Sequence, residues 1–203
     1  RFGAAKGIKD FVMVTLGTGV GGGIVIGGRL SRWSRGFGGE IGHMVIEVGG
    51  VPCPCGGTGH LESYAARPAI IRAARDAAGS YAGASISRLV GGDLDALTAE
   101  IVIQAANAGD PAAAEVMATV GDMLGEAMVG LVNLLNPQAI VGGGGIGESC
   151  PLVSERASAR IASEALAGRR DVKVLLAELG NDAGMAGAAA LAFDDSDSRE
   201  GLH

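Results

Sequence analysis

Apolar residues in the first part of the chain form short runs that predict strands rather than helices. Residues 10–16 (DFVMVTL) are apolar and β-branched without polar alternation, which indicates a buried strand. A second apolar run at 24–26 is followed by two glycines at 27–28, and this pattern predicts a strand that ends in a tight turn. Residues 31–60 are rich in Gly, Pro, Ser and Cys and lack a helical period. We therefore expect a long functional loop there, with one short strand at 44–48.

From Leu61 onward the pattern changes to alanine-rich helical stretches. Residues 61–79 predict a helix that is kinked or restarted at Pro68 and ends at Gly79. Asp110 followed by Pro111 predicts the capped start of a long helix. That helix is expected to end near 135, and the further expected elements are a helix at 99–109 capped by Thr98, a strand at 137–145, a helix at about 151–167, a strand at 172–179 and a helix at 183–193. The alternation predicts one α/β domain.

Composition narrows the class of protein. The chain has 203 residues, of which 48% are hydrophobic and 19% charged, so it is able to bury a large core. Its net charge of −6 and the lack of a basic run argue against a nucleic-acid surface. Glycines interrupt the apolar runs, so we expect no membrane span, and residues 1–10 contain no apolar signal-peptide core. Three cysteines are too few for a disulfide framework, and we expect a cytoplasmic protein.

A glycine-rich stretch at 14–30 (VTLGTGVGGGIVIGGRL) raises the possibility of a nucleotide site. Gly17, Gly19 and Gly22 fit the spacing G-x-G-x-x-G of a dinucleotide-binding turn. That turn must lead into a helix, whereas a strand pattern follows here, so we interpret the stretch as the tip of a β-hairpin. Backbone N–H groups at such a tip are able to surround a phosphate. A strained hairpin without a ligand is the alternative.

A second glycine loop at 141–149 (VGGGGIGES) fits the same spacing and does lie between a predicted strand and a predicted helix. The acidic residue that ends the next strand, Glu178, follows Gly147 by 31 positions. A dinucleotide fold places that acid about 20 positions on. Two loops of this kind favour a split nucleotide site over a dinucleotide fold.

Four potential metal ligands lie within eighteen residues. His43, Cys53, Cys55 and His60 have the spacing H-x9-C-x-C-x4-H, and the remaining histidine is His203. Two thiolates and two imidazoles suit tetrahedral zinc, and the intervening Gly and Pro residues allow the loop to fold back. The alternative is two free cysteines beside two unrelated histidines.

Two carboxylates, Glu40 and Glu62, flank this loop. Carboxylates beside an imidazole are suited to fixing the hydroxyls of a sugar by charge-assisted hydrogen bonds. Ordinary solvated acids are the alternative interpretation of both.

Taken as a set, the stretches VTLGTGVGGGIVIGGRL, GFGGEIGHM and PCPCGGTGHLESYAA, with VGGGGIG after them, resemble the ROK family of sugar kinases and repressors, in particular bacterial glucokinases. The resemblance runs from about residue 3 to 193. It implies the actin-like ATPase (ribonuclease H-like) fold, in which two domains enclose sugar and nucleotide. Residues 1–193 then correspond to the large C-terminal domain with a zinc-bearing loop, 194–203 to a polar tail, and the small N-terminal domain is not part of this chain.

The resemblance also implies roles for individual residues. Sugar-hydroxyl ligands are expected at Glu40, His43 and Glu62. The ATP phosphate loop is expected at Gly17, Thr18, Gly19, Val20, Gly21, Gly22 and Gly23, and the adenosine-side loop at Gly142, Gly143, Gly144 and Gly145. Structural zinc is expected on His43, Cys53 and Cys55, with His60 where the family usually has a third cysteine.

The implied function is the MgATP-dependent phosphorylation of a hexose, with glucose as the expected sugar, by a homo-oligomer that binds neither nucleic acid nor membrane. Mannose or an N-acetyl hexosamine as the sugar, and polyphosphate as the donor, remain open. The alternatives are a sugar-sensing repressor of the same family and an inactive remnant. The family's catalytic aspartate and first phosphate loop precede the segment that matches residues 1–7, so we expect this chain alone to be inactive as a kinase.

Overall fold

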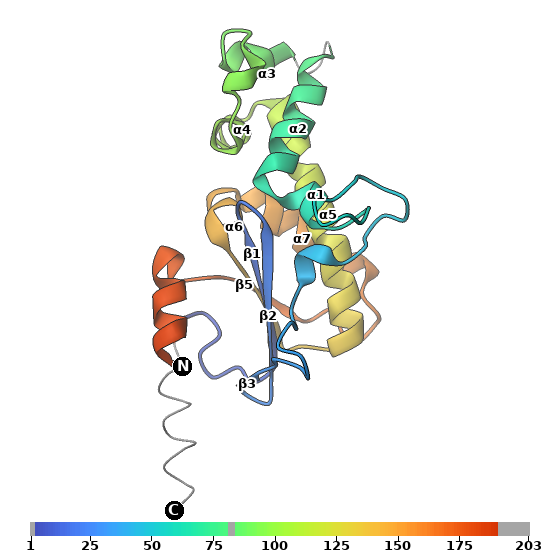
Figure 1. Cartoon of the computed structure of the whole chain (residues 1–203), viewed down its shortest axis with the longest axis vertical. Coiled ribbons are helices and arrows are strands. Elements are labelled where there is room, and N and C mark those ends of the chain that lie inside the picture. The colour runs from blue at the N-terminus through green and yellow to red at the C-terminus, as the bar shows by residue number, and fades with distance from the viewer. Residues whose placement is uncertain (1–2, 81–83, 191–203) are drawn as a thin grey trace, which may run out of the picture.

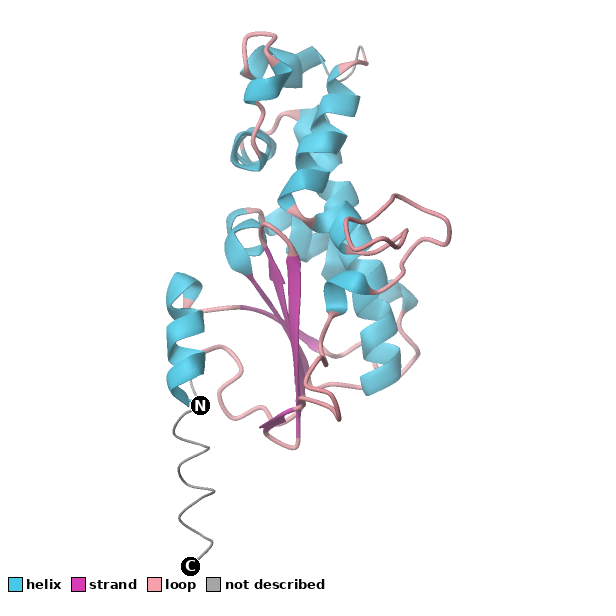
Figure 2. Ribbon diagram, in the orientation of Figure 1, coloured by secondary structure: helices cyan, strands magenta, loops and turns pink. Residues whose placement is uncertain are grey.

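The computed structural model describes residues 3–80 and 84–190, in which five strands form one mixed sheet in the order β3-β2-β1-β4-β5 (Figures 1 and 2). The strands are β1 (Phe11–Leu16), β2 (Val20–Ile26), β3 (Arg29–Leu30), β4 (Ala139–Gly143) and β5 (Lys173–Leu176). The α-helices are α1 (Glu62–Ala65), α2 (Arg67–Ala78), α3 (Ala84–Leu89), α4 (Ala99–Asn107), α5 (Pro111–Leu135), α6 (Gly144–Ser149) and α7 (Pro151–Glu164). Short 3-10 helices lie at η1 (Ile41–His43), η2 (Leu94–Ala96) and η3 (Gly180–Asp182), and residues 183–190 are helical.

The direction of the strands determines where the glycine loops lie. β1 pairs antiparallel with β2 and parallel with β4, and β4 pairs parallel with β5. Because β1 and β4 run in the same direction, Leu16 and Gly143 end their strands at one edge of the sheet. Ligand sites of open α/β sheets lie at this edge.

The core lies between the sheet and two long helices. Val12, Val14 and Leu16 alternate inward along β1 and are at most 2% exposed. Helices α5 and α7 cover this face, whereas the helix at 183–190 lies on the other side of the sheet (Figure 1). Gly121 and Gly125 allow α5 and α7 to approach closely.

The caps expected from the sequence are confirmed. Asp110 Oδ1 accepts the Ala113 N–H at 2.9 Å, and Thr98 Oγ1 accepts the Ile101 N–H at 3.3 Å. Pro111 occupies the first turn of α5, where its missing N–H has no cost. Helices α2, α3 and α4 pack beside the N-terminal half of α5 and project beyond the sheet (Figure 1).

One expectation for the first half was wrong. Residues 44–48 form no strand, because only Val45 pairs, by an isolated bridge to His60. The restart expected at Pro68 is confirmed, because the stretch divides into α1 and α2 at Ala66, whose extended backbone allows Pro68 to lie in the first turn of α2. Helix α3 was not expected at all.

The later elements differ mainly in their ends. α7 stops at Glu164 rather than near 167, and β5 covers only 173–176 of the strand expected at 172–179. The helix expected at 183–193 is described to 190, and the polar tail at 194–203 lies outside the described residues.

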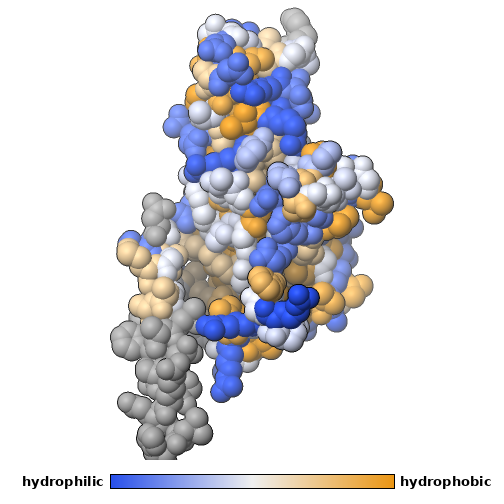
Figure 3. All heavy atoms as spheres, in the orientation of Figure 1, coloured by the Kyte–Doolittle hydropathy of each residue, from blue (hydrophilic) through white to orange (hydrophobic). Residues whose placement is uncertain are grey.

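Helix α5 corrects the expectation that no segment is apolar enough to span a membrane. Among the described residues, α5 has the length and the apolar composition needed to cross a membrane, by those two criteria only. Of its most apolar window, 44% is buried inside the protein. The apolar pattern continues through Gly121, Gly125 and Gly130 because small residues do not break this tightly packed helix. Its buried side faces α7, α4 and α2, as in a core helix. On the face shown in Figure 3, hydrophobic and hydrophilic surface are interspersed.

Candidate functional site

The first glycine loop is shorter than the sequence suggested. Only residues 17–19 form the turn, in which the Gly17 N–H donates to the Gly19 carbonyl at 3.0 Å. Val20 begins β2, so Gly21, Gly22 and Gly23 belong to the strand and pair with β1. The expected phosphate loop at 17–23 is therefore a tight turn followed by a glycine-rich strand.

The second glycine loop lies beside the first, at the end of β1. Gly142 and Gly143 end β4, whereas Gly144 and Gly145 begin α6. Gly144 has φ +84°, and a Cβ atom on it would lie 2.4 Å from the Leu16 carbonyl oxygen. Only glycine satisfies both conditions, and its presence brings the second loop into backbone contact with the last residue of β1, directly before the turn at 17–19.

A pocket of about 390 Å³ opens at this contact and is lined by residues 15–21, Glu62 and Gly144. Glu62 is in the first turn of α1, and its Oε2 accepts the Val20 N–H at 2.9 Å. The structure therefore places Glu62, which was expected to bind sugar, directly against the expected phosphate turn. Its carboxylate holds the turn while it faces the pocket.

The segment that carries Glu40 and His43 packs against the same turn. Gly42 lies between them in sequence, and a Cβ atom on Gly42 would be 2.3 Å from the Val20 carbonyl oxygen. Gly39 and Gly22 also approach each other closely. These contacts attach the segment to the start of β2.

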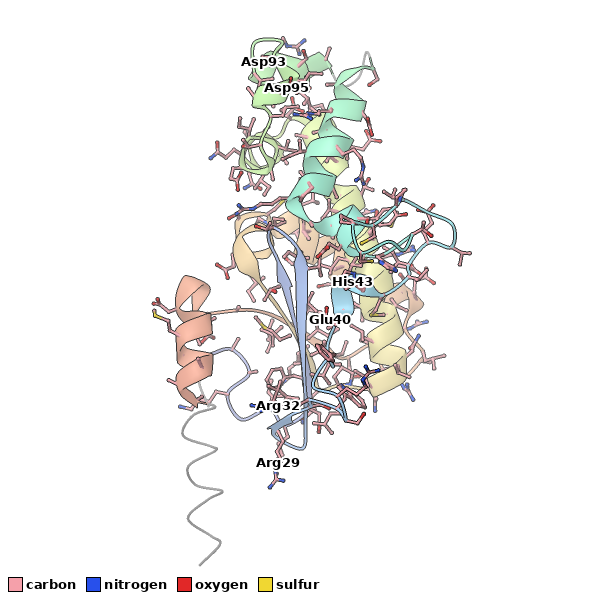
Figure 4. All side chains as sticks on the ribbon, in the orientation of Figure 1. Arg29, Arg32, Glu40, His43, Asp93 and Asp95 are labelled. Carbon is pink, nitrogen blue, oxygen red and sulfur yellow. The ribbon has the colours of Figure 1, made fainter. Side chains whose placement is uncertain are left out.

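Glu40 and His43 lie on one segment beside the sheet, away from Arg29 and Arg32 at the far end of the hairpin (Figure 4). Glu40 Oε2 is 3.9 Å from His43 Nε2, and both side chains are exposed. The opposite ring nitrogen of His43, Nδ1, is 4.0 Å from Cys53 Sγ. One imidazole therefore faces a carboxylate on one side and a thiol on the other.

The four expected metal ligands come together. The ligand atoms of His43, Cys53, Cys55 and His60 all lie within 4.8 Å of one another. Cys55 Sγ is 3.2 Å from His60 Nδ1, and the two imidazole rings meet edge to face. Ligand atoms around tetrahedral zinc are about 3.3–3.8 Å apart, given bonds of about 2.0–2.3 Å. The four residues fit zinc if the largest separation between their ligand atoms shortens by about 1 Å.

The chemistry of the thiols also fits a metal. The backbone N–H of Cys55 beside the sulfur holds the pKa of the Cys53 thiol below its ordinary value. The thiolate is the form that binds a metal. Both cysteines are free rather than paired in a disulfide.

The loop that carries these ligands is fixed to α1 by three hydrogen bonds. Tyr64 Oη donates to Glu47 and accepts the Val51 N–H at 2.7 Å. Ser63 Oγ donates to the Pro52 carbonyl at 3.2 Å. The loop thus has a defined shape that depends on α1 as well as on its own ligand cluster.

Arg67, the first residue of α2, also lies at the site and was not expected there. Its backbone N–H donates to the Gly17 carbonyl at 3.0 Å, and its guanidinium lies 3.2 Å from Glu100 Oε1. A single cation seven residues after His60 gives little signal in a sequence. Only the fold shows that it lies beside both glycine loops.

Comparisons with known proteins bear on the family to which the chain belongs. The model of the ROK family matches residues 1–195. A glucokinase from Halalkalibacterium halodurans is 38% identical over 203 residues, covering 98% of this chain and 60% of that protein. The N-acetylglucosamine repressor of Escherichia coli is 35% identical over 179 residues, covering 88% of this chain and 43% of the repressor.

Solved structures give the same result. A ROK family glucokinase from Streptomyces griseus, in complex with glucose and AMPPNP, matches with a TM-score of 0.86 and 34% identity. The match covers 94% of this chain and 62% of that structure, so the chain spans about 60% of the length of the glucokinases that it resembles. Because the family model matches almost the whole sequence and these relatives share its fold, the chain belongs to the ROK family.

Proposed function

We propose that this chain provides the sugar site and part of the nucleotide site of an ATP-dependent hexose kinase that converts glucose to glucose 6-phosphate. The observation that carries the proposal is the position of Val20. Its N–H is bound by Glu62 and its carbonyl is approached by Gly42, so the expected phosphate turn joins both segments expected to bind sugar. Relatives named glucokinase support glucose as the sugar.

On the sugar side, Glu40 and His43 would bind hydroxyls. Charge-assisted hydrogen bonds from a carboxylate and an imidazole fix both the position and the orientation of a polyhydroxylated ring. His43 Nδ1 faces the cysteines, which leaves Nε2 for the sugar beside Glu40. Zinc held by His43, Cys53, Cys55 and His60 would act as a structural cross-link of the loop.

On the nucleotide side, the turn at 17–19 and the loop at 142–145 would bind MgATP. Glycines there leave backbone groups accessible to phosphate oxygens. Phosphoryl transfer depends mainly on positioning and on charge stabilisation, so a rigid pair of loops beside a sugar site suits this chemistry. The Streptomyces griseus glucokinase, solved in complex with both glucose and AMPPNP, supports this pairing of ligands.

We assign residues 1–193 to the large C-terminal domain of the actin-like ATPase fold. The five-stranded mixed sheet with helices on both sides supports this assignment. By the family resemblance, the general base and the first phosphate loop precede the segment that matches residues 1–7, so we expect residues 1–203 to bind ligands without turnover. A missing general base alone costs about 10²–10⁴ in rate.

A sugar-sensing repressor is the second candidate, because the similarity to the N-acetylglucosamine repressor covers 88% of this chain. A repressor of this family requires the sugar site but no phosphoryl transfer. Binding of MgATP therefore distinguishes the two candidates.

Isothermal titration of zinc-loaded residues 1–203 with glucose, mannose, N-acetylglucosamine and MgATP tests the proposal. We expect saturable binding of glucose and of MgATP, with glucose preferred among the sugars, and loss of glucose binding in Glu40→Gln. Glucose binding without MgATP binding would favour the repressor. Preference for another sugar would overturn the assignment of glucose, and binding of no ligand would overturn the proposal.

A coupled assay of ADP release on the same sample measures turnover. Glucose-dependent turnover of about 1 s⁻¹ or more, an ordinary enzyme rate, would place a general base within these residues.

A further inference from the structure

Arg67 lies between the two glycine loops. It is the first residue of α2, and its backbone N–H donates to the Gly17 carbonyl at 3.0 Å. Its Nη2 atom is 3.4 Å from the position that a Cβ atom on Gly145 would occupy. Arg67 is therefore hydrogen-bonded to the turn through its backbone, and its guanidinium lies beside the second loop.

Two adjoining pockets meet beside this residue. The 390 Å³ pocket includes Gly144, and a second pocket of about 160 Å³ includes Gly145, Arg67 and Glu100. Among the described residues that line the two pockets, the charged groups are Glu62, Glu100 and Arg67. Arg67 is the sole cation of that set.

This charge balance matters for a polyphosphate ligand. Two carboxylates in the lining repel an anion, and the chain as a whole carries a net charge of −6. A guanidinium offers a planar fork of N–H donors that matches phosphate oxygens. Arg67 is placed to counter the repulsion.

The ion pair between Arg67 and Glu100 is weak enough for the guanidinium to bind a phosphate instead. The two atoms are 3.2 Å apart, and the side chains are 44% and 53% exposed. Exposed ion pairs of this kind are weak because water screens them. A phosphate is therefore able to replace Glu100 at small cost.

We propose that Arg67 binds the phosphate chain of the nucleotide and exchanges Glu100 for phosphate when the nucleotide enters. This inference rests on the proposed function, since it requires MgATP to occupy the pair of pockets. Glu100 holds the arginine at the pocket while the site is empty and competes with the ligand for it.

The chain contains a matched control for the test. Arg75 lies two turns further along α2 and pairs with Asp95 at 3.1 Å, with a side chain 42% exposed. Asp95 lies at the far end of the group of helices α2, α3 and α4, away from the glycine loops (Figure 4). Arg75→Ala therefore removes an equivalent exposed pair from the same helix without touching the pockets.

The experiment compares dissociation constants for MgATP, MgADP and adenosine in the wild type, Arg67→Ala, Arg67→Lys and Arg75→Ala. We expect Arg67→Ala to weaken MgATP by about 10- to 100-fold, the range for loss of a hydrogen bond to a charged group. Adenosine should bind as in the wild type, because it has no phosphate. Arg67→Lys should recover part of the affinity, and Arg75→Ala should change none of the constants.

Glu100→Gln provides the second variant, since it removes the competing charge and keeps Arg67. We expect MgATP to bind at least as tightly as in the wild type.

Two results would overturn the inference. The first is equal weakening of MgATP binding by Arg67→Ala and Glu100→Gln, which would mean that the ion pair acts only on structure. The second is equal weakening of adenosine and MgATP binding by Arg67→Ala. If the wild type binds MgATP and Arg67→Ala binds it equally tightly, the inference is overturned but the proposed function is not. Wild-type protein that binds no MgATP would overturn both the inference and the kinase proposal, whereas glucose binding would still report on the sugar site.

Discussion

Glu62 Oε2 accepts the backbone N–H of Val20 at 2.9 Å, and this hydrogen bond joins α1 to the first residue after the turn at 17–19. A Cβ atom on Gly19 would lie 2.5 Å from the same oxygen, so the carboxylate fills the space over the turn. We expect Glu62→Ala to weaken the binding of both glucose and MgATP, because the turn loses its support. Glu62→Gln keeps an acceptor for Val20 and should weaken only glucose, which isothermal titration of both ligands measures. Unchanged MgATP affinity in Glu62→Ala would contradict this coupling.

Metal content is the first property to measure at the cluster formed by His43, Cys53, Cys55 and His60. Elemental analysis of protein purified in metal-free buffer should give about one zinc per chain, because four soft ligands form a closed site. Cys53→Ala and Cys55→Ala should each release it and make the loop sensitive to proteases. Cys150 is buried outside the cluster, so Cys150→Ser serves as the control and should retain zinc. Stoichiometric zinc in the double variant of Cys53 and Cys55 would refute the site.

We expect His43 to bind both zinc and sugar, whereas Glu40 should bind sugar alone. Its Nδ1 faces Cys53 and its Nε2 faces Glu40, so His43→Ala should lower both zinc content and glucose affinity. Glu40→Gln should lower glucose affinity and leave zinc unchanged. Zinc analysis and glucose titration of the two variants side by side measure this division. Equal loss of zinc from both would show that the two residues do not divide the roles.

The contact between α5 and α7 should tolerate no side chain at Gly121. A Cβ atom there would lie 2.6 Å from Arg156 Cβ and 2.9 Å from the Val153 carbonyl oxygen. We expect Gly121→Ala to lower the free energy of unfolding by about 1–3 kcal/mol through overpacking. Gly130 in the same helix has only an ordinary contact of 3.7 Å with Met44, so Gly130→Ala should raise stability by up to about 1 kcal/mol. Urea unfolding of the two variants provides the comparison, and equal effects would contradict it.

The N-terminus of α5 should be sensitive to acid. The Ala113 N–H, with a smaller contribution from Ser85, holds the pKa of the Asp110 carboxyl below its ordinary value. A depressed folded pKa means that the stabilisation is complete above the unfolded value of about 3.9 and is lost as the pH falls through the folded value. Asp110→Ala should cost about 1 kcal/mol near neutral pH.

The control for this cap is Asp110→Asn, which keeps an acceptor oxygen but does not ionise. Its free energy of unfolding should depend less on pH in the acid range than that of the wild type. Identical pH profiles for the two proteins, measured by urea unfolding, would exclude Asp110 as the source of acid sensitivity.

Local signals in the sequence predicted most of the sheet and the ligand cluster. The strand at 11–16, the caps at Thr98 and Asp110, and the grouping of His43 with the cysteines follow from short patterns whose physics is local. The sequence could not show that 44–48 lacks a pairing partner, because strand formation depends on a neighbour distant in the chain. The position of Arg67 likewise depends on how β1, β4 and α2 meet.

The distance between Gly144 and Leu16 has a consequence for dynamics. A Cβ atom on Gly144 would be 2.4 Å from the Leu16 carbonyl oxygen, so the second loop packs directly against the last residue of β1. We therefore expect the loop at 142–145 to be held in place by the end of β1, which leads directly into the turn at 17–19. Ordering a flexible loop on binding costs conformational entropy, and a preformed edge avoids that cost. We therefore expect a ligand at this edge to bind with little of the entropy cost of ordering the protein.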